Sequence, residues 1–466
     1  MILFNAKIFS ESILREGTIL VKDGKIKDIR FNPTQDDLKD LRNQNGTDHE
    51  IDCQKKIIIP GIIDIHAHLR DLEQIEKESF SSGTKAAAYS GITTVFNMPN
   101  TNPPVITPER VASWMEKAQD NIYTNVGFIA GVPRGINMDE MKEMKKQGVL
   151  GFKIYPLDSL NGIDWTNTSN IRILFRRSSQ LRTRIFIHPD WPKSSKEKSI
   201  IYSNYITWGW PLLKFHNKLF SVDTEEKYVQ FILKNYKEFI ENNDLPPEKY
   251  PIIHFCHISS KNSYRKINKT LNSVDNANIT YEITPHHLLL SNTLELKNEN
   301  LGKVLPPLRD PKHSEFLFQK FRDGEIMLIG TDHAPHTLHE KNLDYFDAPS
   351  GFPGFETYPL LLLNKICQYE LSLEIFVKAS AQRPAQIFNL PSKGFIKVGY
   401  DADLLIIDKI PEYSIDPQKF HTKAKYSPFQ NFPSKVEIWK VFLRGKEVNR
   451  EDIEPLGQVI RDQNDN

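Results

Sequence analysis

Short apolar runs recur along the middle of the chain, and segments with a helical period separate most of them. Eight runs can be counted: Ile62–His68, Ile92–Asn97, Asn125–Ala130, Leu150–Ile154, Thr183–His188, Ile252–His257, Ile279–Ile283 and Ile326–Asp332. The run that leads into the first, Ile57–Ile65, is almost continuously apolar, which suits a strand buried on both faces of a parallel sheet. Eight such strands alternating with helices predict an α/β fold, a (β/α)8 TIM barrel.

The helices between these runs carry their own signals. Thr107-Pro108-Glu109 offers a capping residue, a proline at the first helical position and an early acid, which predicts a helix start. Apolar residues follow a helical period through Glu225–Glu241.

Both ends of the chain read as β-structure instead. Thr18–Arg30 alternates around Asp23-Gly24, a strong hairpin signal, and Gly394–Asp408 and Val436–Val448 are strand-like. We expect these segments to form one small β-sandwich domain from residues 1–55 and 392–448, flanking a barrel domain of residues 56–391. The polar stretch Asn32–Glu50 is expected to be an exposed loop. Residues 449–466 form a polar C-terminal tail that we expect to fray after Glu454.

Bulk properties narrow the functional classes. Sixty basic and 59 acidic residues among 466 give a formal charge of +1, which recommends neither nucleic acid nor an anionic membrane as a partner. No apolar run approaches the roughly 18–20 residues of a membrane span, and the N-terminus does not read as a signal peptide. Three cysteines, an odd and small number, fit a reducing cytoplasm. We therefore expect a cytoplasmic protein.

Candidate metal ligands stand at or near the carboxyl ends of the runs. His66 and His68 share one strand face at a spacing of roughly 6–7 Å, so both can reach one ion. Two histidines capping a buried strand are an equally good interpretation of this pair alone. Other runs, however, end at or near Lys153, His188, His257 and Asp332, and barrel active sites form at this end of the strands. Six such groups are too many for one tetrahedral zinc and suit two metals.

Lys153 is the unusual member of the set, because an ammonium beside two cations is disfavoured. A buried lysine can lose its proton, and the neutral amine can react with CO2 to give an anionic carbamate ligand. A lysine that extends to solvent at the barrel rim is the alternative. Two metals can share a bridging hydroxide that attacks a carbonyl, while Asp332 takes the proton and delivers it to the leaving nitrogen. This chemistry hydrolyses an amide or closes one.

The sequence resembles the dihydroorotases, class I type, in the cyclic amidase group of the amidohydrolase superfamily, over nearly its whole length. The resemblance rests on an ordered series of motifs: PGIIDIHAHLRD (60–71), GTKAAAYSGITTVFNMPNT (83–101), GFKIY (151–155), HFCHISS (254–260), TPHHLLL (284–290), PPLRD (306–310), GTDHAPHT (330–337) and GFPGFET (351–357).

The resemblance implies a site with two zinc ions per chain, bridged by carboxylated Lys153 and by hydroxide. It implies that the ligands are His66, His68, Lys153, His188, His257 and Asp332, with Asp332 also the catalytic acid and base. It further implies that the substrate carboxylate is held by Arg70, Asn100 and His336. A forked guanidinium suits that role.

The activity that the resemblance implies is the reversible cyclisation of N-carbamoyl-L-aspartate to L-dihydroorotate, with release of water, in pyrimidine (UMP) synthesis. It also implies a homo-oligomer, dimer or tetramer, and an association with aspartate carbamoyltransferase. Two departures bear on this. Leu305 replaces an asparagine common before the Pro-Pro-Leu-Arg run, and the segment after His188 lacks the usual acidic sequence.

Two alternatives to this activity remain at this stage. A sister cyclic amidase (an allantoinase, hydantoinase or dihydropyrimidinase) would share the metals and the mechanism. A catalytically silent dihydroorotase-like subunit should have lost ligands, and this chain keeps all six. His254 is expected to support the site rather than bind metal, and His286 and His287 suit either the pocket lining or the core.

Overall fold

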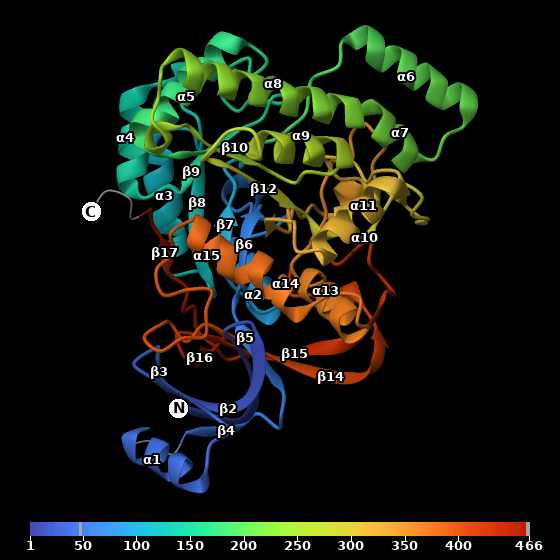
Figure 1. The fold of residues 1–466 in the computed structure, drawn as a ribbon. Helices are drawn as coiled ribbons and strands as arrows, with labels where there is room; N and C mark the ends of the chain where they lie inside the picture. The colour runs from blue at the N-terminus through green and yellow to red at the C-terminus, as the bar shows by residue number, and fades with distance from the viewer. Residues whose placement is uncertain (46–48, 463–466) are drawn as a thin grey trace.

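A parallel barrel forms the centre of the computed structural model, which describes residues 1–45 and 49–462 (Figure 1). Its eight strands lie at the eight apolar runs and pair in sequence order: β6 (Ile62–Ala67), β7 (Ile92–Asn97), β8 (Asn125–Gly131), β9 (Gly151–Ile154), β10 (Arg184–Ile187), β11 (Ile252–Phe255), β12 (Ile279–Ile283) and β13 (Leu328–Ile329). The predicted (β/α)8 barrel is confirmed.

The barrel closes between its last and first strands through residues just beyond β13. The Asp332 amide donates to the carbonyl of His66 at 2.9 Å, and the His68 amide donates to the carbonyl of His333 at 2.7 Å. Ala67 and His333 form a parallel bridge at the same place. These backbone bonds therefore close the barrel at the carboxyl ends of its strands, where the predicted site residues lie.

Helices surround the barrel and bury their apolar faces on it. They include α2 (Phe80–Tyr89), α3 (Pro108–Gln119), α4 (Met138–Gln147), α5 (Thr168–Leu181), α8 (Val222–Asn242), α9 (Lys261–Leu271), α11 (Pro311–Arg322), α13 (Tyr358–Cys367), α14 (Leu373–Val377) and α15 (Arg383–Ile387). Thr107 caps α3 as predicted, because its side chain accepts from the amide of Arg110. Shorter helices line the rim or connect strands: α7 (Leu212–Leu219), α10 (Pro285–Leu289) and α12 (Leu338–Lys341).

One helix, α6 (Ser195–Trp208), extends away from the body of the molecule (Figure 1) and has no buried residue. The longest helix, α8, packs inward with residues such as Tyr228, Ile232 and Tyr236. Within the part of the chain that the structure describes, none of the helices combines the length and the apolar character that a bilayer crossing requires.

A second, mixed sheet is built from both ends of the chain, as predicted. It contains β1 (Ile2–Ser10), β2 (Ile13–Lys22), β3 (Lys25–Phe31), β4 (Glu50–Asp52), β5 (Ile57–Pro60), β14 (Leu404–Ser414), β15 (Pro433–Leu443) and β16 (Lys446–Glu447). Strand β5 joins the two halves, since it pairs with β1 on one side and β14 on the other. Figure 1 shows the first and last strands together beneath the barrel. The exact domain boundaries, residues 1–55 with 392–448 and 56–391, stay a prediction.

The structure differs from the sequence-based expectations in two connecting segments. The expected loop Asn32–Glu50 contains α1 (Gln35–Asn45), because Leu41 packs into a small cluster with Ile2 and Leu20. Part of the expected frayed tail is also ordered: β17 (Val459–Ile460) pairs in parallel with β8. Ion pairs of Arg30 with Asp37 and Asp40 also hold α1, and backbone pairing holds β17. These contacts with other parts of the chain leave no periodic signal in the sequence.

Arg309, in the PPLRD motif, is a buried structural residue of the rim. Its guanidinium donates to Ser259 Oγ at 2.8 Å and to Asn217 Oδ1 at 2.9 Å, and it pairs with Glu225 Oε2 at 3.2 Å. The exposed fractions of the paired side chains are 2% for Arg309 and 0% for Glu225. The loop after β11, which carries His257, is thereby tied to α8.

We expect Arg309→Met to lower the free energy of unfolding by about 3–5 kcal/mol, because it leaves the Glu225 charge buried without its partner. Urea denaturation followed by circular dichroism measures the change. The matched control is Arg172→Met, which breaks an exposed pair with Glu238 and should cost less than about 1 kcal/mol. Equal losses in the two variants would contradict a special role for the Arg309–Glu225 pair.

Candidate functional site

A cavity of about 290 Å³ opens at the carboxyl ends of the barrel strands. Its walls come from loops after most of the strands, and its lining contains His66, His68, Arg70, Asn100, Tyr155, Asp158, Leu160, His188, His257, Val304, Leu305, Asp332, Ala334, His336, Ser350 and Gly351. Every sequence-predicted site residue except Lys153 is in this lining. The cavity thus gathers side chains that are up to 270 residues apart in sequence, from His66 to His336.

Three of the predicted metal ligands converge on one point. Asp332 Oδ1 lies 3.0 Å from His68 Nε2 and 3.5 Å from His66 Nε2. The ligand atoms of these three buried residues all lie within 4.8 Å of one another, close enough to bind one ion together. His66 lies on β6 and His68 directly follows its last residue, and this spacing produces the geometry because alternate residues of an extended chain point to the same side.

The other three predicted ligands lie beside this group. His188 Nδ1 is 3.1 Å from His257 Nε2, and the His257 ring centre is 5.1 Å from that of His66. The Lys153 ammonium, the second nitrogen of His188 and the second nitrogen of His257 are all buried without a hydrogen-bond partner. Buried polar groups are rarely left unpaired. Buried nitrogen atoms that lack a hydrogen-bond partner fit a metal centre, in which these side chains would be ligands.

Burial keeps two of these histidines neutral. It lowers the pKa of His68 to about 4 and that of His188 to about 3. Burial alone would raise the pKa of Asp332, but His66 and His68 outweigh it and hold that pKa well below its usual range. Burial lowers the pKa of His66, but the Glu282 carboxylate outweighs it and raises that pKa to about 10, so a metal bound there would displace a proton from His66. At neutral pH His68 and His188 therefore offer imidazole lone pairs and Asp332 offers an ionised carboxylate, which are the ligand states that a divalent cation requires.

Three of the predicted site residues have left-handed backbone conformations. The φ angles are 54° at Arg70, 36° at His257 and 50° at Asp332. Such conformations cost free energy in residues other than glycine. Residues that adopt them cluster at functional sites, where the surrounding structure enforces them. Each of the three follows a barrel strand within a few residues, where the chain turns its side chain into the cavity.

Glu282 supports the metal ligands, and the sequence analysis did not identify it. This fully buried carboxylate on β12 accepts hydrogen bonds from His66 Nδ1, from His254 Nε2 at 3.1 Å and from the His257 amide at 3.2 Å. A proton on His66 Nδ1 leaves Nε2 free to face Asp332. His254 is thus a supporting residue, as expected. The available signal was a charged residue inside the apolar run Ile279–Ile283.

The predicted carboxylate-binding residues occupy the other side of the cavity. Asn100 Oδ1 accepts from His68 Nδ1 at 2.6 Å, which connects the two sides. Arg70 NH2 lies 3.1 Å from His336 Nε2, and both side chains are largely buried. Tyr155, another residue that sequence reasoning missed, lines the cavity with its buried hydroxyl unpaired.

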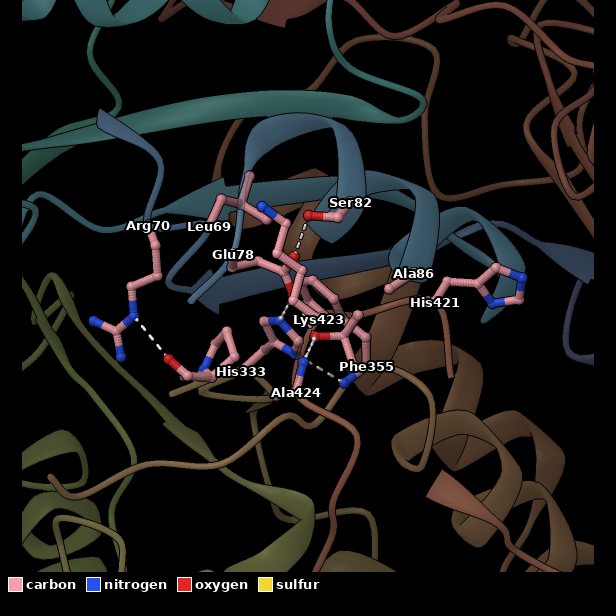
Figure 2. Close-up of polar contacts among 12 residues, drawn as sticks. Leu69, Arg70, Glu78, Ser82, Ala86, His333, Phe355, His421, Lys423 and Ala424 are labelled. Carbon is pink, nitrogen blue, oxygen red and sulfur yellow. Dashed lines mark hydrogen bonds and ion pairs between the residues drawn. The ribbon is translucent and has the colours of Figure 1, made fainter. Parts of the chain in front are cut away.

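Several other candidates lie outside the cavity lining. His287 is held in the core by Thr284 Oγ1 and the carbonyl of Pro306, and His286 packs against Phe352. His333, beside Asp332, stacks on Phe355 with ring centres 3.8 Å apart. Figure 2 shows that His333 and Phe355 gather with Glu78 and Ser82, while Arg70 lies to the side. These contacts, which lie outside the cavity lining, hold the loop after β13 in place.

Comparison with known proteins agrees with this architecture. A profile described as "Amidohydrolase family" matches residues 57–149 and 215–448. The chain therefore belongs to the amidohydrolase family, whose enzymes are generally metal-dependent hydrolases. Among its relatives, a dihydroorotase of Methanosphaera stadtmanae is 32% identical, covering 92% of each chain. A dihydroorotase of Bacillus cytotoxicus is also 32% identical, covering 91% of this chain and 93% of the other.

Solved structures show the same fold. An L-hydantoinase (dihydropyrimidinase) from Arthrobacter aurescens superimposes with a TM-score of 0.85 at 24% identity, covering 99% of both chains. A D-hydantoinase (dihydropyrimidinase) from a Thermus species gives a TM-score of 0.82 at 22% identity, also covering 99% of both chains. At these identities the likeness concerns the barrel and its flanking sheet.

We expect Glu282→Gln to weaken the binding of zinc, used as a probe of the candidate metal site, by about 10–100-fold, since an amide has one acceptor oxygen where the carboxylate has two and cannot orient His66 and His254 together. Titration against a chelator, with metal analysis of the purified protein, measures the change. The matched control is Glu356→Gln, a carboxylate that accepts from His421 and Thr422 outside the cavity. Unchanged zinc affinity in Glu282→Gln would remove Glu282 from this role.

Proposed function

We propose that this protein is a dihydroorotase, which cyclises N-carbamoyl-L-aspartate reversibly to L-dihydroorotate with release of water, a step of pyrimidine synthesis. The observation that supports it best is a single cavity with the histidine–aspartate cluster on one side and the buried Arg70 guanidinium on the other. A ring that carries a carboxylate next to its amide matches this division. The relatives named dihydroorotase support the same activity.

We further propose a centre of two zinc ions held by the six groups His66, His68, Lys153, His188, His257 and Asp332, with Lys153 carboxylated. The unpartnered Lys153 ammonium supports this. If the uncharged amine reacts with CO2, the oxygens of the resulting carbamate could bind the two metal ions. Zinc bound there would polarise the amide carbonyl and lower the pKa of water, supplying a hydroxide nucleophile at neutral pH.

The residues of the chain supply binding and proton transfer. Arg70, with Asn100 and His336, would hold the substrate carboxylate and so place the ring amide beside Asp332. Asp332 is ionised at neutral pH, so in ring opening it accepts a proton from the attacking water and delivers it to the ring nitrogen that leaves. In ring closure the same transfers run in reverse.

One observation favours a sister cyclic amidase as the second candidate. Leu305 lines the cavity where a polar residue is common among dihydroorotases, and it removes one hydrogen bond to a polar ring. A hydantoinase, dihydropyrimidinase or allantoinase would share the metal chemistry. An uncharged ring would leave the buried Arg70 charge without a negative partner. Arg70 therefore argues for a substrate that carries a carboxylate.

The wider setting of the proposed enzyme rests on the same identification. Cys53, Cys256 and Cys367 are unpaired thiols, which suits the reducing cytoplasm that we propose as its location. A homo-oligomer, dimer or tetramer, and an association with aspartate carbamoyltransferase stay predictions.

Zinc-loaded protein should turn over dihydroorotate with a kcat/KM on the order of 100-fold above hydantoin, dihydrouracil or allantoin, because a site built around a buried guanidinium leaves it unpaired with a neutral ring. Parallel steady-state assays of the four compounds measure the ratio. Preference for hydantoin, dihydrouracil or allantoin would replace the proposed activity with that of the sister amidases.

Replacing Asp332 by asparagine should lower kcat by on the order of 10²–10⁴-fold, since the amide cannot carry the proton. The variant should keep most of its zinc, because the five other groups remain. Steady-state kinetics and metal analysis on the same preparation test both statements. Wild-type activity in Asp332→Asn would exclude it as the acid and base.

A further inference from the structure

His336, on the carboxylate side of the cavity, touches three polar partners. Its Nε2 lies 3.1 Å from Arg70 NH2 and 3.1 Å from the carbonyl oxygen of Ser350. Its Nδ1 lies 3.4 Å from the ammonium of Lys77, which comes from the segment before α2. The sequence analysis gave Lys77 no role.

These partners select one tautomer of the neutral ring. An ammonium only donates, so Lys77 requires a lone pair on Nδ1 and places the proton on Nε2. That proton has an acceptor in the Ser350 carbonyl, and a bound carboxylate can share it through a three-centre hydrogen bond. The opposite tautomer would satisfy Arg70 alone and would set Nδ1–H against the ammonium and the Nε2 lone pair against a carbonyl oxygen. Glu340 does not accept a hydrogen bond from Nδ1–H in that tautomer, because its Oε2 is 3.9 Å from Nδ1.

The favoured tautomer leaves Arg70 available for a ligand. Its Nε donates to the carbonyl of Pro335 at 3.2 Å, a bond that Figure 2 draws. Its NH2 faces the Nε2–H of His336 and gains no acceptor there. Within residues 1–45 and 49–462, the structure records no ion pair between Arg70 and a carboxylate. Two N–H donors from different loops therefore stand side by side in the cavity wall.

We propose that Lys77 is a positioning residue of the carboxylate subsite, which fixes His336 as the Nε2–H tautomer so that His336 and Arg70 present adjacent donors to one carboxylate. Lys77 does not line the cavity, and it acts through His336. This inference rests on the proposed function for the identity of the substrate, but the tautomer itself does not depend on it.

Lys77 is well placed to hold this arrangement. Its ammonium pairs with Glu340 Oε1 at 2.7 Å, and its side chain is 14% exposed. Glu340 in turn caps α12, where its other oxygen accepts from the amide and hydroxyl of Thr337. The ammonium is thus anchored to the helix that directly follows His336.

Lys77→Met should raise the KM for dihydroorotate on the order of tenfold or more while kcat changes by less than about threefold, because a charge-assisted hydrogen bond to the carboxylate is lost before chemistry. Lys77→Arg keeps a cationic donor and should restore KM. The matched control is Lys378→Met, which also removes a paired ammonium but breaks an exposed pair with Glu374 outside the cavity lining. It should leave KM within about twofold.

A second measurement reads the tautomer directly. In zinc-loaded protein with ¹⁵N-labelled histidine, the signals of His336, assigned with a His336→Gln variant, should show protonated Nε2 and unprotonated Nδ1. Lys77→Met should shift them toward the opposite tautomer, and Lys77→Arg should not. Thermal unfolding confirms that each variant is folded.

Three results would overturn the role of Lys77: a wild-type His336 protonated on Nδ1, a Lys77→Met variant that keeps both tautomer and KM, or a Lys378→Met variant that raises KM as much. A wild-type protein that fails to turn over dihydroorotate would instead contradict the proposed function. The tautomer measurement would still decide the role of Lys77 in that case.

Discussion

Closure of the parallel barrel is the constraint on which the site depends. Strand β13 is only two residues long, so the seam to β6 is completed by backbone bonds between residues 66–68 and 332–333. These are the same residues whose side chains form the histidine–aspartate cluster. Closing the barrel and bringing His66 and His68 to Asp332 are therefore one event, and a seam shifted by one residue would turn these side chains away from the cavity.

The cluster places many polar groups in a region that excludes water, and their arrangement shows how the protein tolerates this. Glu282 satisfies His66, His254 and the His257 backbone from one carboxylate. Gly330 makes room for it, because a Cβ there would lie 2.9 Å from Glu282 Oε2. The buried charges of Arg309 and Glu225 likewise satisfy each other beside the loop after β11. Among the predicted ligands, Lys153, His188 and His257 each keep a buried nitrogen without a hydrogen-bond partner, as groups that would bind a metal should.

Much of the fold follows from periodicity, and much of the site follows from the fold. Eight apolar runs predicted eight strands, and His66, Lys153, His188, His257 and Asp332 stood at one end of them, so the sequence could predict that they meet. Glu282 and Lys77 could not be found in this way, because each acts through a neighbour that is distant in sequence. The ordered segments α1 and β17 were not predicted for a related reason: contacts with other parts of the chain order each of them, and such contacts leave no pattern in the sequence.

The two sides of the cavity have opposite electrostatic character, and this restricts what the cavity can bind. On one side, the neutral imidazoles of His68 and His188 and the Asp332 carboxylate present lone pairs that suit cations. On the other, Arg70 and the Nε2–H of His336 present donors, and Lys77 lies behind them. The two sides meet at Asn100, whose oxygen binds His68. A ligand that satisfies both must carry an anionic group a short distance from a carbonyl that metal can polarise. An uncharged ring would satisfy the first side and leave the buried Arg70 guanidinium without a negative partner on the second, which costs free energy because that charge is withdrawn from water.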